Sequence, residues 1–228
     1  MLNTNFNLKQ KTLIVKGVEA IQYLRSMGLT YDIFFKAVIN GYKEQRAKSI
    51  YSPPITRSIA FWDNSIVGLR EILSKELGWR ICDKYNLNRT ISPDNKFAII
   101  VSSGNANVGK NYNPSTMNRK GELSAAVIDV NNNIQLTLPL FPIPDKKSQK
   151  YNIERIPHWF FLYYNDGAKI WMELSYPKEI GYDGRISSWY TRIIMEPVEI
   201  VSSDKISSVL NNRKLNVNLK EIDISKKY

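Results

Sequence analysis

The glycine-rich segment Gly104–Lys110 comes nearest to a known chemical motif. It fits the G-x-x-x-x-G-K part of a phosphate-binding loop and follows Phe97–Val101, an apolar stretch typical of a strand. That motif also needs Ser or Thr after the lysine, to hold magnesium, and a helix whose N-terminus faces the phosphates. Here Asn111 follows, and Tyr112-Asn113-Pro114 opposes a helix. We therefore interpret the segment as a glycine-rich turn.

Side chains suited to catalysis are few. His158 is the only histidine, and its place at the start of an apolar stretch favours a packed residue over a base or ligand. Cys82, the only cysteine, lies in a strand-like pattern with no second histidine for a Cys–His pair. A structural zinc site needs pairs of Cys and His residues, which this sequence lacks. A metal nuclease needs converging carboxylates, and Asp129 is the only candidate for one. We expect no catalytic residue, no metal and no cofactor, and a non-enzymatic protein rather than an enzyme.

Positive charge is the strongest functional signal in the sequence. Lys and Arg total 32 against 21 Asp and Glu, a formal net charge of +11. Residues 1–150 carry 21 basic and 11 acidic side chains, whereas residues 151–228 carry 11 and 10. A field of this sign attracts polyanions, of which nucleic acid is the commonest inside cells. We therefore expect the first 150 residues to bind nucleic acid, with DNA favoured.

Two short helices expected within residues 18–46 have the layout of a helix-turn-helix: the first ends at a turn with Gly28, and Thr30 is the expected N-cap of the second. The polar side of the second helix carries Lys36, Asn40 and Lys43, and Arg46 and Lys48 follow at its end. Asparagine pairs with adenine edges, and lysine reaches guanine or phosphate. The alternative is an ordinary helical hairpin packed on a sheet, which the large aromatic residues and the glycine of the second helix favour.

A second basic group lies on residues 104–121, a segment rich in glycine, asparagine and lysine. Lys110, Arg119 and Lys120 could contact a nucleic-acid backbone from a flexible loop there. Long irregular connections of this kind are usually functional loops or linkers.

Two other functions stay open. The protein could be an inhibitor or complex subunit that docks its basic face on an acidic protein, or a divergent metal-dependent nuclease. The single cysteine fits a reducing compartment, and because no apolar run has bilayer length we expect a cytoplasmic protein without membrane contact. The Asn-, Ile- and Lys-rich composition suggests an AT-rich genome and a phage or plasmid origin.

These residues must be positioned by an α+β fold, with N-terminal helices followed by an antiparallel sheet. A third helix is expected to begin near Asp63, or earlier so that it includes residues 59–62, and to end at Gly78. It buries a stripe of Ile66, Leu69, Leu73 and Leu77. Short strands are predicted at residues 79–85, 96–101, 125–130 and 134–138. Residues 158–200 predict a three-stranded antiparallel meander whose first turn is Asp166-Gly167. We expect a basic α+β domain over residues 1–150 and a small β region over 151–228, which can belong to the same domain.

Overall fold

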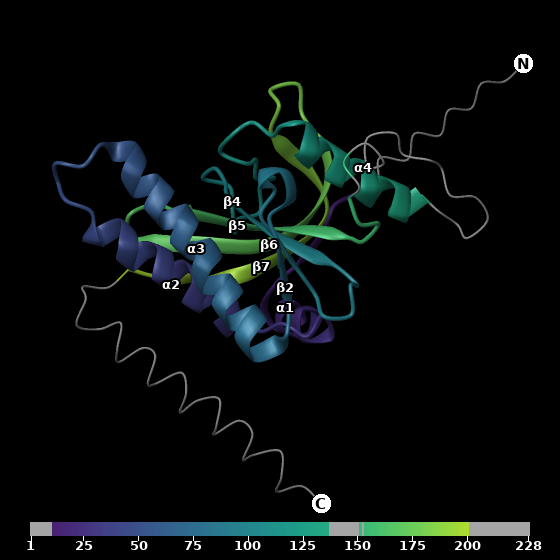
Figure 1. Cartoon of the computed structure of the whole chain (residues 1–228), viewed down its shortest axis with the longest axis horizontal. Helices are drawn as coiled ribbons and strands as arrows, with labels where there is room; N and C mark the ends of the chain where they lie inside the picture. The colour runs from purple at the N-terminus through teal and green to yellow at the C-terminus, as the bar shows by residue number, and fades with distance from the viewer. Residues whose placement is uncertain (1–10, 137–150, 152, 201–228) are drawn as a thin grey trace, which may run out of the picture.

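The computed structural model describes residues 11–136, 151 and 153–200 (Figure 1). They form a seven-stranded sheet in the order β1-β7-β6-β5-β4-β3-β2. The strands are β1 (Leu13–Val15), β2 (Arg80–Cys82), β3 (Arg89–Ile91), β4 (Ala98–Ser103), β5 (His158–Asn165), β6 (Lys169–Ile180) and β7 (Ile186–Glu199). The helices are α1 (Gly17–Ser26), α2 (Tyr31–Ala47), α3 (Pro54–Leu77) and α4 (Glu122–Leu136), with a short 3-10 turn, η1 (Lys84–Asn86).

The sheet is mixed rather than antiparallel. The predicted meander is present, since β5 pairs with β6 and β6 with β7 in antiparallel fashion. However, β4 pairs with β5 and β1 with β7 in parallel. The sequence pattern places a strand at residues 96–101 without indicating its neighbour, and it predicts no strand at β1. Strands from residues 1–150 therefore lie on both sides of the meander in one sheet.

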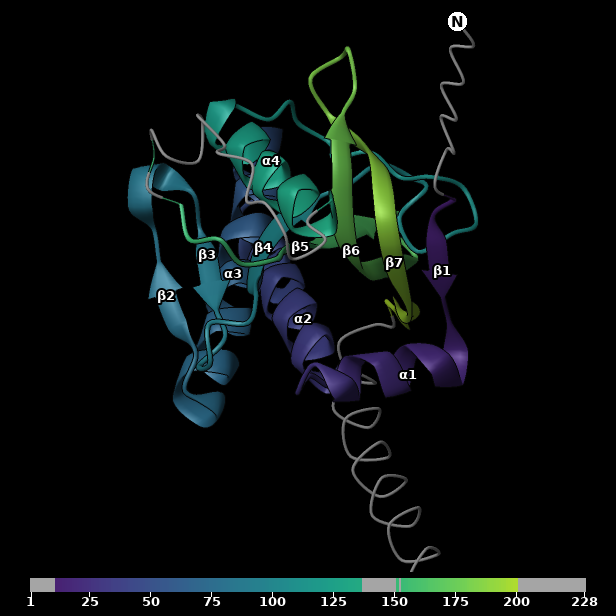
Figure 2. The ribbon, with the colours of Figure 1, turned by 90° about the vertical axis from the view of Figure 1, so that its right-hand side faces the viewer.

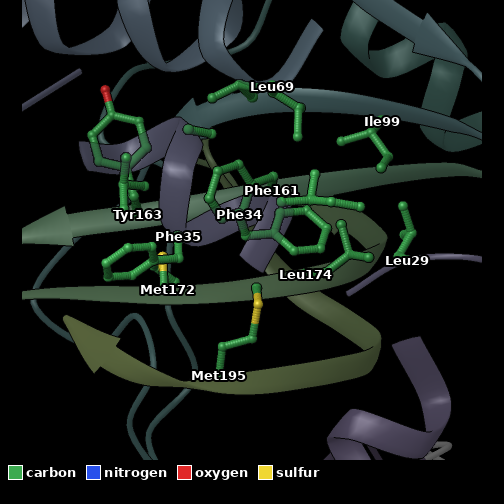
Figure 3. Close-up of a cluster of buried hydrophobic side chains, with 14 of the residues drawn as sticks. Leu29, Phe34, Phe35, Leu69, Ile99, Phe161, Tyr163, Met172, Leu174 and Met195 are labelled. Carbon is green, nitrogen blue, oxygen red and sulfur yellow. The ribbon is translucent and has the colours of Figure 1, made fainter. Parts of the chain in front are cut away.

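Helices cover both faces of the sheet, and Figure 2 shows α4 on the side opposite α1 and α2. The larger core lies between α1, α2 and α3 and one sheet face, where the Phe34 and Phe161 rings pack 4.8 Å apart (Figure 3). A smaller core lies between α4 and the other face.

Helix α3 begins at Pro54, well before Asp63, because proline suits the first turn of a helix. It ends at Gly78, whose φ of 70° is the left-handed conformation that glycine adopts readily. The predicted burial of Ile66, Leu69 and Leu73 is confirmed, whereas Leu77 is exposed.

Helices α2 and α3 pack so closely that one residue of α2 must be glycine. A Cβ atom at Gly41 would lie 2.3 Å from Ser65 Oγ and 2.5 Å from the Phe61 carbonyl oxygen. Gly41 thus allows the close approach of the two helices.

The prediction of two strands at residues 125–130 and 134–138 is wrong for the described part of that segment. Residues 122–136 form one helix, α4, while 137 and 138 lie outside the described residues. Ala126, Val127, Ile128 and Val130 are buried against the smaller core, and Asn131, one turn beyond Val127, is buried as well. The β-branched residues favoured a strand locally, but this one-sided burial stabilises a helix.

The predicted turn between β5 and β6 is confirmed. Gly167 has a φ of 93°, and Asp166 Oδ1 accepts hydrogen bonds from the backbone N–H groups of Ala168 and Lys169. This turn lies at the same end of the molecule as the C-terminus of α2, because Asn165 Nδ2 donates to Gln45 Oε1 at 3.2 Å.

Candidate nucleic-acid interface

The connection between α2 and α3 carries a concentration of basic side chains. We call residues 43–59, which span the last turn of α2, the connecting turn and the start of α3, the α2–α3 tip. It extends past the ends of the strands (Figure 1). It holds Lys43, Arg46, Lys48 and Arg57 against one acidic residue, Glu44. Among the described residues, no ion pair involves the first three of these cations, and all three side chains are exposed.

Large apolar side chains are exposed on the same tip. Tyr51 is 91% exposed, Ile50 78% and Ile55 63%, and Ile59 is also exposed. Single exposed apolar residues are normal on a protein surface, but a group of them within one short segment marks an interaction site. The tip therefore combines cations with apolar contact area.

Hydrogen bonds fix the backbone of this turn. Ser49 Oγ accepts from Tyr51 N at 3.2 Å, and the Ser49 carbonyl accepts from Ser52 N at 3.0 Å and from Arg57 Nη2 at 3.2 Å. Thr56 Oγ1 donates to the Pro53 carbonyl at 2.6 Å, which closes the first turn of α3. The exposed side chains are thus displayed on an ordered segment.

Two of the predicted binding residues lie further back on α2. Lys36 is exposed and forms an ion pair with Asp32 at 2.6 Å, so its charge is largely compensated. Asn40 Nδ2 donates to the Asn64 carbonyl at 2.9 Å, and a Cβ at Gly68 would lie 3.1 Å from Asn40 Cβ. The sequence pattern predicts Asn40 on the outer side of α2. In the structure it faces α3, because α3 packs along that side.

The arrangement of α1 and α2 also differs from a helix-turn-helix. Helix α1 packs on β7 and β1, whereas α2 packs along α3. Seven residues of α2 are buried, including Phe34 and Phe35, which leaves a narrow exposed strip. The pair behaves as two helices of a layer on a sheet.

The glycine-rich loop, residues 104–121, crosses the α4 face of the sheet and is tied to it by a buried ion pair. Arg192 Nη2 lies 2.6 Å from Glu173 Oε2, and both side chains are fully buried. The same guanidinium donates to the carbonyls of Lys110 at 2.9 Å and Tyr112 at 3.0 Å, while Gly109 N donates to Glu173 Oε2 at 2.8 Å. No helix follows Lys110 before α4 begins at Glu122, so a nucleotide-binding loop is not formed.

Lys110 lies at the same end of the molecule as the α2–α3 tip. Its Nζ is 4.9 Å from the centre of the Trp171 ring, and Trp171 Nε1 donates to Asp166 Oδ2 at 2.7 Å. The hydrogen bond from Trp171, backbone N–H groups and the charge of Lys110 lower the pKa of the Asp166 carboxyl. A carboxylate therefore compensates part of the positive charge of Lys110.

Arg119 and Lys120 lie elsewhere, next to the turn between β6 and β7. Arg119 is exposed and packs against Gly184, whose carbonyl accepts from Lys120 N at 2.7 Å. Lys120 Nζ points inward, donates to Ser102 Oγ at 2.8 Å and lies 5.9 Å from the Phe160 ring centre. Burial lowers the pKa of this amine to about 8. The seven predicted residues thus fall into separate places, with Lys43, Arg46 and Lys110 at one end.

A buried polar cluster at the start of β5 was not predicted. Arg89 in β3 forms an ion pair with Glu154, contacts Cys82 Sγ at 3.0 Å and lies 3.5 Å from His158 Nε2. Burial, with the nearby Arg89 charge, lowers the pKa of His158 to about 3. A neutral histidine packed among these groups fits the structural role expected for it.

The carboxylates considered for a metal site lie apart from one another among the described residues. No group of three His, Cys, Asp or Glu side chains within them could hold a metal ion. The sequence pattern predicts Asp129 near the end of a strand, whereas in the structure it lies in α4. In the same part of the chain, no helix has the length and apolar character needed to cross a bilayer.

The apolar members of the tip were not predicted from the sequence, although Lys48 was. The signal was the succession of three basic residues, Ile50-Tyr51 and two prolines. Comparisons of the chain with models of protein families, with curated proteins and with solved structures find no match.

Proposed function

We propose that this is a non-enzymatic, cytoplasmic nucleic-acid-binding protein whose α2–α3 tip contacts phosphates. The observation that supports the proposal is the set of three exposed cations, Lys43, Arg46 and Lys48, with no ion-pair partner among the described residues. Cations that are not already paired gain most from a phosphate, since binding releases the counterions of the nucleic acid without breaking an internal contact.

Lys110 extends the proposed surface around the end of the sheet. The contacts from Gln45 through Asn165 and Asp166 to Trp171 connect the C-terminus of α2 with this lysine. Because Asp166 lies beside it, Lys110 should contribute less to phosphate binding than the tip does. Lys36, which is paired with Asp32, should also contribute little.

The test is a binding titration with a fluorescent oligonucleotide at several salt concentrations. The variant Lys43→Gln/Arg46→Gln/Lys48→Gln should bind more weakly and show a salt slope reduced by about 0.7–0.9 for each lost phosphate contact. A matched control removes three exposed basic side chains outside the tip that form no ion pair among the described residues, Arg25→Gln/Lys84→Gln/Arg155→Gln. Its net charge is the same, so it separates the tip from the general field of the protein.

If the two triple variants bind equally well, the nucleic-acid-binding surface does not lie at the tip. If the parent protein binds neither DNA nor RNA at low salt, the proposal is wrong. The apolar residues Ile50, Tyr51 and Ile55 would then favour the runner-up, a subunit or inhibitor that docks on an acidic protein, because interfaces between proteins combine such a centre with a charged rim.

A further inference from the structure

The α2–α3 tip also bears on which form of nucleic acid is bound. Reading a duplex requires an element that enters a groove and presents polar side chains to base edges. Helix α2 does not offer this, because Asn40 is hydrogen-bonded to α3 and Gly41 holds the two helices in contact. The tip instead presents an aromatic ring and aliphatic side chains.

Tyr51 is the most exposed of these side chains, and its surroundings are suited to a nucleotide. Lys48 precedes it by three residues and is exposed, and Ile50 adds apolar area beside it. Arg57 Nη2 donates to the Ser49 carbonyl, the same carbonyl that accepts from Ser52 N. A planar ring and a nearby cation can bind the base and the phosphate of one nucleotide.

The hydrogen-bonded turn gives this arrangement a physical advantage. Because Tyr51 N donates to Ser49 Oγ, the backbone under the ring is ordered before any ligand arrives. A ring on a fixed backbone loses less conformational entropy on stacking than one on a flexible loop. Within the described part of the fold, the Tyr51 ring is almost fully exposed and therefore adds little to the packing of the protein.

We propose that the nucleic acid bound at the tip is single-stranded, with an unpaired base stacked on Tyr51 and the adjoining phosphates held by Lys48 and Arg46. In a duplex, each base face is covered by its neighbours, so only a single strand offers a free face together with its phosphates. This inference rests on the proposed function and adds the class of ligand to it.

The experiment compares three probes of equal length: a mixed-sequence single strand, its duplex, and an abasic strand that keeps the phosphates without the bases. The variants are Tyr51→Leu, which keeps apolar area without a ring, and Tyr51→Phe, which keeps the ring. Tyr182→Leu serves as the matched control, because Tyr182 is a fully exposed tyrosine in the β6–β7 turn.

We expect the parent protein to bind the single strand more tightly than the duplex or the abasic strand. Tyr51→Leu should weaken binding to the single strand by about ten-fold, within the range for loss of one stacked base. It should leave binding to the abasic strand unchanged. Tyr51→Phe and Tyr182→Leu should resemble the parent on all three probes.

Other outcomes separate the two proposals. Suppose the single strand and duplex bind equally well and Tyr51→Leu has no effect, while the triple charge variant loses affinity. Then the tip binds phosphates, and stacking is excluded. Absence of binding to every probe at low salt overturns both the stacking and the proposed function.

Discussion

The α2–α3 tip and the glycine-rich loop look alike in sequence but differ in what the fold does with their charges. Both are basic and interrupted by residues that break regular structure. In the tip, Lys43, Arg46 and Lys48 remain on the surface. In the loop, Lys110 lies over Trp171 and Lys120 turns inward to Ser102. Local charge in a sequence therefore does not tell which cations a partner can reach.

The difference comes from the sheet under the loop. The described sheet face beneath residues 109–112 holds the buried pair of Glu173 and Arg192, whose polar atoms need partners in the absence of water. Backbone groups of the loop form hydrogen bonds with both side chains, so the loop covers this ion pair. The tip covers no such groups and is free to carry exposed side chains.

Removing the buried guanidinium should have the largest effect on stability. Arg192→Met would leave Glu173 buried without its partner and the carbonyls of Lys110 and Tyr112 without donors. We expect the free energy of unfolding to fall by about 3–5 kcal/mol, measured by chemical denaturation. The control is Lys169→Met, which breaks the exposed pair with Glu199 and should cost less than about 1 kcal/mol. Equal losses would contradict the anchoring role of Arg192.

The buried amine of Lys120 should make stability depend on pH. Burial lowers its pKa to about 8 in the folded protein, against 10.5 for an ordinary lysine. Between these values the unfolded chain binds more protons, so the free energy of unfolding gained from this group rises with pH. The whole rise is on the order of 3 kcal/mol, and it is complete above the unfolded pKa.

The measurement is the difference in unfolding free energy between the parent and Lys120→Met at about pH 8 and about pH 10. We expect the parent to gain stability over this range relative to the variant. A Lys120→Met difference that does not vary with pH would mean that the amine is solvated.

The sequence predicted the elements whose pattern is local and missed those that depend on a distant partner. The meander of β5, β6 and β7 and the buried stripe of α3 follow from periodicity and turn residues. Helix α4 was missed because it contains several β-branched residues, Val127, Ile128, Val130 and Ile134, and only packing against the sheet favours a helix there. Strand β3 was missed because it is three residues long and includes Arg89, which is buried only through partners elsewhere in the chain.

The candidate site shows the same limit. Lys43 and Arg46 were found because they follow the polar side of a helix, and that position keeps them exposed. Asn40 occupies the same side by spacing, but α3 covers it, and no local pattern could reveal this. Tyr51 was missed because exposure of an aromatic residue is visible only in the folded chain.

The smallest expected effect is on the stability of the tip variants, and it decides how their binding data are interpreted. The side chains of Lys43, Arg46 and Lys48 have no ion-pair partner among the described residues, and surface substitutions of this kind usually change stability by less than about 0.5 kcal/mol each. Neutralising Arg46 removes a cation from the last turn of α2, where it interacts favourably with the helix dipole, but it also reduces repulsion within a chain of net charge +11. These terms oppose each other, so we expect the free energy of unfolding of Lys43→Gln/Arg46→Gln/Lys48→Gln to lie within about 1 kcal/mol of that of the parent.

Chemical denaturation of this variant and of Arg192→Met under the same conditions compares the two regions directly. If the tip variant loses as much stability as Arg192→Met, its cations support the fold, and its weaker binding would reflect unfolding instead of lost phosphate contacts.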